Sequence, residues 1–416
     1  MNADPSQLYI ERSKTLRFIN RTGGLLTKIG LDPFQLNAEK IIQVAIKKAE
    51  FQGTLPEQTE AGLRKLVRSI NKDADANPFA RLAAKILFER TLYSRLKVEQ
   101  TLSTYPEIEE TPIKKPLFII GMPRTGTTIL HALLNEDPAN RSPLAWECLL
   151  PFPVPTPETY QNNEQVKTIK KEFSQLFKLV PDFKKKHYLA ADAPQECLGI
   201  SALDFNSFQP AAQFYIPSYM DWFSNESNQL STMQWHKRFL QYLGSGGVTG
   251  ERWLLKTPVH LMRLEELFEV YPDACVIMTH RDPKKVIPSA SSLVSTVRSL
   301  YSDTEDVART GQEQCKIWAS YFESFMQSRS KLNKEDQIID LRFEDFVSDH
   351  LGVVRKIYQH FNLDLTETAQ SRMKDFLNQN PKDKHGKHDY ALEDFELTPQ
   401  IIDSTFEHYY NFLEKL

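Results

Sequence analysis

Up to about residue 100, hydrophobic side chains recur every three or four positions, as they do on one face of a helix. Short stripes of this kind cover residues 41–49 and 63–70. A longer stripe follows Asn77-Pro78, a pair typical of a helix start because asparagine caps the first turn and proline fits within it. The pattern predicts a helical N-terminal extension over residues 1–115.

After residue 115 the pattern changes to short, continuous apolar runs, which occur at residues 116–120, 253–255, 274–279 and 337–341. Runs of this length suit strands that are buried on both faces, as in a parallel sheet. Helical patterns separate them, and amphipathic segments follow over 353–361 and 398–413. The alternation predicts an α/β domain over residues 116–416, with a P-loop-type, mostly parallel β-sheet flanked by helices.

Charge and composition exclude several classes of function. The 51 Lys and Arg residues nearly balance the 54 Asp and Glu residues, for a net charge of −3, so we expect no nucleic-acid partner. The apolar runs are too short to span a membrane and the N-terminal residues too polar for a signal peptide. We expect a cytoplasmic protein without a transmembrane segment, and peripheral contact with a membrane stays open. The wide spacing of the cysteines indicates free thiols and no metal site; they are Cys148, Cys197, Cys275 and Cys315.

The strongest local signal lies directly after the first apolar run. Residues 121–128 read Gly-Met-Pro-Arg-Thr-Gly-Thr-Thr and precede a helical pattern. A strand, a glycine-bearing turn and a helix start together form a phosphate site, because backbone N–H groups and the helix dipole favour an anion. A nucleoside-triphosphatase loop would carry lysine where Thr127 stands. A P-loop kinase is therefore the alternative interpretation, and a nucleotide-binding module without turnover is another.

The same segment resembles the 5′-phosphosulfate loop of sulfotransferases that use 3′-phosphoadenosine 5′-phosphosulfate (PAPS). Arg281 at a strand end, with Ser289 eight residues later, resembles the pair that holds the 3′-phosphate in that family. Lys256 is similar to the lysine that contacts the bridging or sulfuryl oxygens. Residues 137–147 resemble a segment of the bacterial-type branch, which carries a helical N-terminal extension.

The resemblance implies that PAPS is the sulfuryl donor and that no metal is required. The residues that it assigns to the donor are Pro123, Arg124, Thr125, Gly126, Thr127, Thr128, Arg281 and Ser289. Lys387, in a basic segment over 382–388, is a loose analogue of the family's late loop over the 3′-phosphate. Ile129 and Phe343 replace a Trp and a Tyr of the mammalian cytosolic members, so the stacking of adenine stays open.

Sulfuryl transfer to an alcohol also needs a group that accepts the proton. The cytosolic members use a histidine where this chain has Pro258. Glu147 lies in the region where tyrosine-directed and carbohydrate-directed relatives place a glutamate, and it is the leading candidate. His187 and Glu196 are the alternatives, and His260 is a further candidate.

The acceptor is expected to be small and mostly apolar. No Lys or Arg occurs between His187 and His236, whereas aromatic residues are dense there. Anionic glycans are normally held by Arg or Lys, so a lipophilic hydroxylated or phenolic acceptor fits better. The sequence predicts in-line transfer of a sulfuryl group from PAPS to such a hydroxyl, with a carboxylate or histidine base.

Overall fold

The computed structural model describes residues 12–28, 34–160, 162–179, 190–380 and 391–416. At its centre lies a five-stranded parallel sheet in the order β2-β3-β1-β4-β5. The strands are β1 (Leu117–Gly121), β2 (Asn140–Arg141), β3 (Arg252–Lys256), β4 (Cys275–His280) and β5 (Ile338–Arg342). The four predicted apolar runs lie in β1, β3, β4 and β5, which confirms the α/β class. The two residues of β2 carry no pattern and were not predicted.

The helices of the N-terminal part are α1 (Lys14–Lys28), α2 (Ala38–Ala49), α3 (Glu57–Lys72), α4 (Pro78–Thr104) and η2 (Pro106–Glu110). Those between β1 and β3 are α5 (Thr127–Leu134), α6 (Ala145–Leu149), α7 (Glu164–Leu179), α9 (Cys197–Leu203), α10 (Gln209–Gln213), α11 (Pro217–Asn225) and α12 (Gln229–Gly244). Those between β3 and β5 are η3 (Pro258–Met262), α13 (Leu264–Val270), α14 (Pro283–Tyr301), α15 (Val307–Leu332) and η4 (Glu335–Gln337). The last are α16 (Phe343–Ser348), α17 (His350–His360), α18 (Glu367–Gln379), η5 (Glu393–Phe395), α19 (Pro399–Thr405) and α20 (Glu407–Leu413).

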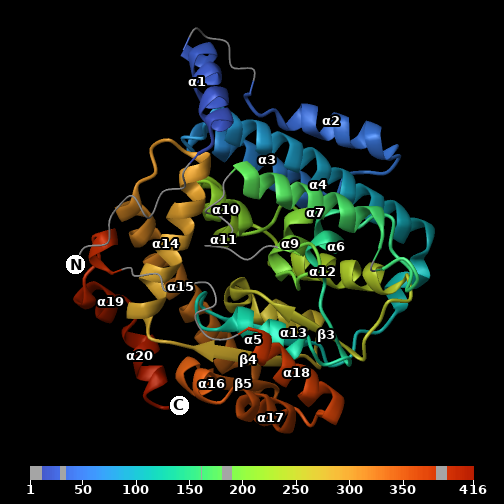
Figure 1. Ribbon diagram of the computed structural model, residues 1–416, viewed down its shortest axis with the longest axis vertical. Helices are drawn as coiled ribbons and strands as arrows, with labels where there is room; N and C mark the ends of the chain where they lie inside the picture. The colour runs from blue at the N-terminus through green and yellow to red at the C-terminus, as the bar shows by residue number, and fades with distance from the viewer. Residues whose placement is uncertain (1–11, 29–33, 161, 180–189, 381–390) are drawn as a thin grey trace.

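Both faces of the sheet are covered, as the continuous apolar runs require. Along β1 the side chains alternate: Leu117 and Ile119 join a cluster with α5, α17 and α18, whereas Phe118 and Ile120 join a larger cluster with α12, α13 and α15. Figure 1 shows α16, α17 and α18 below the sheet and the N-terminal helices above it. All five residues of β1 are buried.

The N-terminal helices share the larger of these two clusters. Leu63 of α3 and Leu92 of α4 belong to the same buried cluster as Phe118 of the sheet. Asn77 caps α4 as predicted, accepting a hydrogen bond from the N–H of Ala80, with Pro78 in the first turn. The division of the chain at residue 115 stays a prediction, and the hydrophobic core runs across that boundary.

One expectation needs refinement. The predicted helix over 398–413 is two helices, α19 and α20, because the chain turns at Phe406, whose side chain is buried. The four cysteines are free, as expected, and all are buried. Within the described ranges, no helix combines the length and the apolar character that a membrane crossing needs.

Candidate active site

The loop between β1 and α5 lies at the carboxyl end of the sheet and depends on two glycines. Gly121 has φ +134°, and a Cβ there would lie 2.5 Å from the hydroxyl of Thr279 and 2.6 Å from its carbonyl oxygen. Gly126 has φ +85° and caps α5, and a Cβ there would lie 3.0 Å from the ring of Phe343. Side chains at these positions would push the loop off β4 and off Phe343.

The predicted donor residues of this loop differ in accessibility. Arg124 and Thr128 are exposed, and Pro123 is half-buried. Thr125 and Thr127 are buried. The hydroxyl of Thr125 donates to the carbonyl of Met122 over 2.7 Å and lies 2.7 Å from the hydroxyl of Thr279. The side chain of Thr125 thus holds the loop together, which leaves its backbone to face a ligand.

The second predicted motif meets this loop in space. Because β4 pairs with β1, its end brings Arg281 beside the loop. Nη1 of Arg281 donates to the carbonyl of Arg124 over 2.8 Å, and Nε of Arg124 donates to the hydroxyl of Ser289 over 2.9 Å. The guanidinium of Arg281 lies 4.1 Å from the centre of the Phe343 ring. Residues more than 150 positions apart therefore form one cationic surface.

Two tyrosines of the last helix support Arg281, and the sequence analysis missed them. The hydroxyl of Tyr409 accepts from the N–H of Arg281 over 3.2 Å and donates to its carbonyl over 3.3 Å. The hydroxyl of Tyr410 donates to Asp282 over 2.7 Å. Their positions in an amphipathic helix indicated only core packing, and no local pattern pairs them with the end of β4.

Lys256 ends β3, on the other side of β1, and forms an ion pair with Glu196. The lysine side chain is 4% exposed, whereas that of Glu196 is 33% exposed. Glu196 is the N-cap residue of α9 and makes no capping hydrogen bond with its side chain. One accessible carboxylate therefore lies against a buried ammonium group.

Glu147 lies in a different environment. It is fully buried, and its two oxygens accept from Arg141 over 2.8 Å, from the N–H of Leu144 over 2.9 Å and from Tyr160 over 3.3 Å. Burial raises the pKa of the Glu147 carboxyl, against the opposing charge of Arg141. The carboxylate anchors α6 and neutralises a buried arginine.

One predicted residue, His260, is buried and is not part of this surface. His187 and Lys387 lie outside the described residues. The dense aromatic residues before His236 are mostly core, since Phe205, Phe214 and Trp235 belong to the large buried cluster.

An apolar cleft lies beside the start of α9. Leu66, Leu87 and Phe88 line it from α3 and α4, and Gly199 and Leu203 line it from α9. Gln195, the neighbour of Glu196, also lines it. The cleft is therefore lined by the residue next to Glu196 in the sequence and by the N-terminal helices.

Comparison with known proteins decides the family. Residues 116–367 match the model of the sulfotransferase family. The chain belongs to this family. It is accordingly an enzyme that transfers sulfuryl groups, which confirms the resemblance drawn from the sequence motifs.

Several mycobacterial proteins are similar to this sulfotransferase. The omega-hydroxy-beta-dihydromenaquinone-9 sulfotransferase Stf3 of Mycobacterium tuberculosis is 25% identical over 320 residues, which cover 74% of this chain and 76% of the relative. The crystal structure of sulfotransferase STF1 from Mycobacterium tuberculosis has a TM-score of 0.79 at 28% identity and covers 89% of this chain and 98% of that chain. That of STF9 from Mycobacterium avium has a TM-score of 0.83 at 28% identity, with 90% and 96% covered.

Proposed function

We propose that this sulfotransferase uses PAPS and transfers its sulfuryl group to a hydroxyl of a small, mostly apolar acceptor. The observation that carries the proposal is the contact between the two predicted anion-binding segments, Arg281 with Arg124 and Arg124 with Ser289. PAPS carries an anionic group at the 5′ position of its ribose and another at the 3′ position. A ligand of this kind needs two cationic segments at a fixed separation, and ATP needs only one.

In this proposal the loop of residues 123–128 and the first turn of α5 bind the 5′-phosphosulfate, through backbone N–H groups and the guanidinium of Arg124. Arg281 and Ser289 bind the 3′-phosphate, and Lys387 stays a predicted further contact. The packing of Arg281 on Phe343 holds the guanidinium plane in place. Tyr409 fixes the backbone from which Arg281 projects.

For the chemical step we propose Lys256 and Glu196. The acceptor oxygen attacks sulfur as the bond from sulfur to the bridging phosphate oxygen breaks, so negative charge builds up on the leaving phosphate. A buried ammonium at Lys256 is suited to stabilise that charge. Glu196 takes the acceptor's proton. Two observations support Glu196 over Glu147: the carboxylate of Glu196 is accessible, and it contacts Lys256. Both oxygens of Glu147, by contrast, already accept hydrogen bonds inside the protein.

The apolar cleft beside Glu196 supports a lipophilic acceptor. Its lining from α3, α4 and α9 is largely hydrocarbon, and Gln195, Gln209 and Gln213 add polar groups. The name of the relative Stf3 gives a hydroxylated menaquinone derivative, which is a lipophilic alcohol. We further propose a cytoplasmic location, because four free, buried cysteines suit a reducing compartment.

The test is calorimetric binding of adenosine 3′,5′-bisphosphate and of AMP to the full chain. We expect Arg281→Ala to lower the affinity for the bisphosphate by about 10-fold to 100-fold, because a charge-assisted contact of about 1.5–3 kcal/mol is lost. The affinity for AMP should stay nearly unchanged. Lys285→Ala, which removes an exposed cation from the same region of α14, is the matched control and should change neither affinity. Equal losses for both nucleotides, or a preference for ATP over the bisphosphate, would refute the donor assignment.

A further inference from the structure

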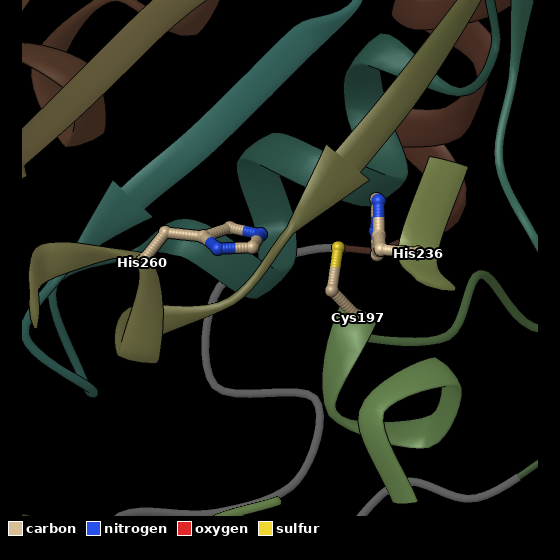
Figure 2. Close-up of side chains that lie close together, drawn as sticks. All are labelled: Cys197, His236 and His260. Atoms are coloured by element: carbon tan, nitrogen blue, oxygen red, sulfur yellow. The ribbon is translucent and has the colours of Figure 1, made fainter. Parts of the chain in front are cut away.

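Three side chains that the proposed reaction does not use meet in the interior of the protein. They are Cys197 at the start of α9, His236 on α12 and His260 in η3, and Figure 2 shows them side by side. Their exposed fractions are 2%, 1% and 1%. The sulfur of Cys197 and one ring nitrogen of each histidine all lie within 4.8 Å of one another.

These histidines carry nitrogen atoms that no other group satisfies. Among the described residues, Nε2 of His236 and both ring nitrogens of His260 have no hydrogen-bond partner. Buried polar groups are nearly always paired, because an unpaired one has lost its water without compensation. Three such nitrogens next to a thiol therefore indicate a ligand that binds nitrogen and sulfur.

The surroundings hold both rings in place. Nδ1 of His236 lies 2.7 Å from the hydroxyl of Tyr271, a buried residue, so Nε2 is the atom left to bind an ion. This arrangement is typical of metal-binding histidines, whose second nitrogen is fixed by a hydrogen bond. Phe118 packs its edge against His260 with ring centres 5.2 Å apart, and the rings of His236 and His260 are perpendicular at 5.9 Å.

We propose that Cys197, His236 and His260 form a binding site for a thiophilic transition-metal ion, Cu⁺ or Zn²⁺. One thiolate and two imidazoles are ligands that both ions accept. Three atoms bound to one ion at about 2.0–2.3 Å in a trigonal arrangement lie about 3.5–4.0 Å from one another, so the side chains must close in by up to about 1 Å when the ion binds.

The charges around the cluster fit this proposal and favour the monovalent ion. A metal ion binds the neutral form of an imidazole, and both rings are buried in the same interior as Arg263. The ion displaces the proton of the Cys197 thiol, which leaves to solvent as the metal–sulfur bond forms. With one thiolate, Cu⁺ forms a centre without net charge beside the buried Arg263, whereas Zn²⁺ leaves one positive charge.

The location gives such an ion a structural role near the reacting groups. Cys197 directly follows Glu196, and His260 is four residues after Lys256. An ion that joins them would tie the start of α9 to the segment after β3 and so hold Glu196 and Lys256 together. The ion takes no part in the transfer.

The test uses the full chain, purified without a histidine tag and stripped with a chelator. It is incubated with Zn²⁺, or with Cu⁺ under anaerobic reducing conditions, and desalted, and the bound metal is measured by mass spectrometry. We expect about one ion per chain, with Cu⁺ retained against stronger competing chelators than Zn²⁺. Cys197→Ser and His260→Gln should weaken binding by more than about 100-fold, since even outer contacts of a metal site contribute 10-fold to 100-fold.

Cys275→Ser is the matched control, because Cys275 is also a free, buried cysteine but lies on β4, outside the cluster. It should bind the ion as the wild-type chain does. If the ligand variants do not fold, titration of the folded wild-type chain with Co²⁺ shows whether Cys197 binds the ion, because a thiolate ligand of Co²⁺ produces a charge-transfer absorption. No ion and no such absorption on the folded wild-type chain, or equal binding by Cys197→Ser and Cys275→Ser, would overturn the proposal.

Discussion

Glu147 and Glu196 show how the surroundings of a single residue decide what it can do. Both are glutamates in the first turn or at the cap of a short helix. The oxygens of Glu147 accept three hydrogen bonds inside the protein. The carboxylate of Glu196 contacts Lys256 and keeps a third of its surface accessible. A general base must be accessible to the acceptor hydroxyl, and of the two carboxylates only that of Glu196 is accessible.

We therefore expect Glu196→Gln to lower kcat by about 10²-fold to 10⁴-fold, the usual range for a positioned base, with binding of adenosine 3′,5′-bisphosphate near that of the wild-type enzyme. Glu147→Gln should instead lower the free energy of unfolding, by up to about 3–5 kcal/mol, because it leaves the charge of Arg141 buried without a counterion. Steady-state kinetics and urea unfolding separate the two effects. A folded Glu147→Gln enzyme without activity, beside an active Glu196→Gln enzyme, would return the role to Glu147. If both stay active, His187→Gln is the remaining variant to assay.

Among the elements, α4 shows how a cap sets both the start of a helix and its position in the molecule. The side chain of Asn77 accepts from the N–H of Ala80 over 2.9 Å, as a helix cap does. Its amide also donates to the carbonyl of Leu300 at the end of α14, over 3.1 Å. One buried residue thus starts α4 and attaches it to the helix that carries Ser289. By contrast, Asn37 caps α2 through the N–H of Lys40 and is exposed.

These two asparagines form a matched pair. We expect Asn37→Ala to lower the free energy of unfolding by about 0.5–1 kcal/mol, the loss of one exposed cap. Asn77→Ala should cost more, about 2–3 kcal/mol, because it also leaves the buried carbonyl of Leu300 without its donor. Urea unfolding of both variants measures the difference. Equal losses of unfolding free energy in the two variants would mean that the contact of Asn77 with α14 does not stabilise the protein.

On the scale of the whole molecule, the N-terminal helices are joined to the rest of the chain by a buried ionic network. Arg95 of α4 pairs with Glu99 on its own helix and with Asp204 after α9, 3.6 Å away. Its guanidinium lies 3.5 Å from the centre of the Trp235 ring on α12. Arg238 of α12 pairs with Glu99 from the other side, over 2.8 Å. The network and the shared hydrophobic core make the extension a part of one folded unit.

Replacing Arg95 should therefore destabilise the entire molecule. We expect Arg95→Met to lower the free energy of unfolding by about 3–5 kcal/mol, because Asp204 then stays buried without its cation. Arg64→Met is the control: Arg64 pairs with Glu39 and Glu60 on the surface, is 43% exposed, and should cost less than about 1 kcal/mol. Calorimetry of the wild-type chain should show one unfolding transition. A separate early transition for the helices, or a negligible effect of Arg95→Met, would contradict this.

The sequence by itself determined the features that arise from neighbouring residues. The continuous apolar runs of β1 and β4 require burial on both faces, and this alone predicted a parallel sheet with helices around it. Asn77-Pro78 predicted the start of α4 because a cap acts within one turn. The loop from Gly121 to Thr128 was recognisable because glycines, hydroxyls and a cation at that spacing follow a strand.

Only the tertiary structure decided how distant segments meet. The pairing of β1 with both β3 and β4 brings Lys256 and Arg281 to either side of one loop. The same packing encloses Glu147 and leaves Glu196 accessible, although the two carboxylates look alike in the sequence. It also sets Tyr409 against Arg281, and Cys197 beside two histidines. Burial and contact are properties of the packed chain, and the period of a local pattern shows which face of an element is buried but not what it is buried against.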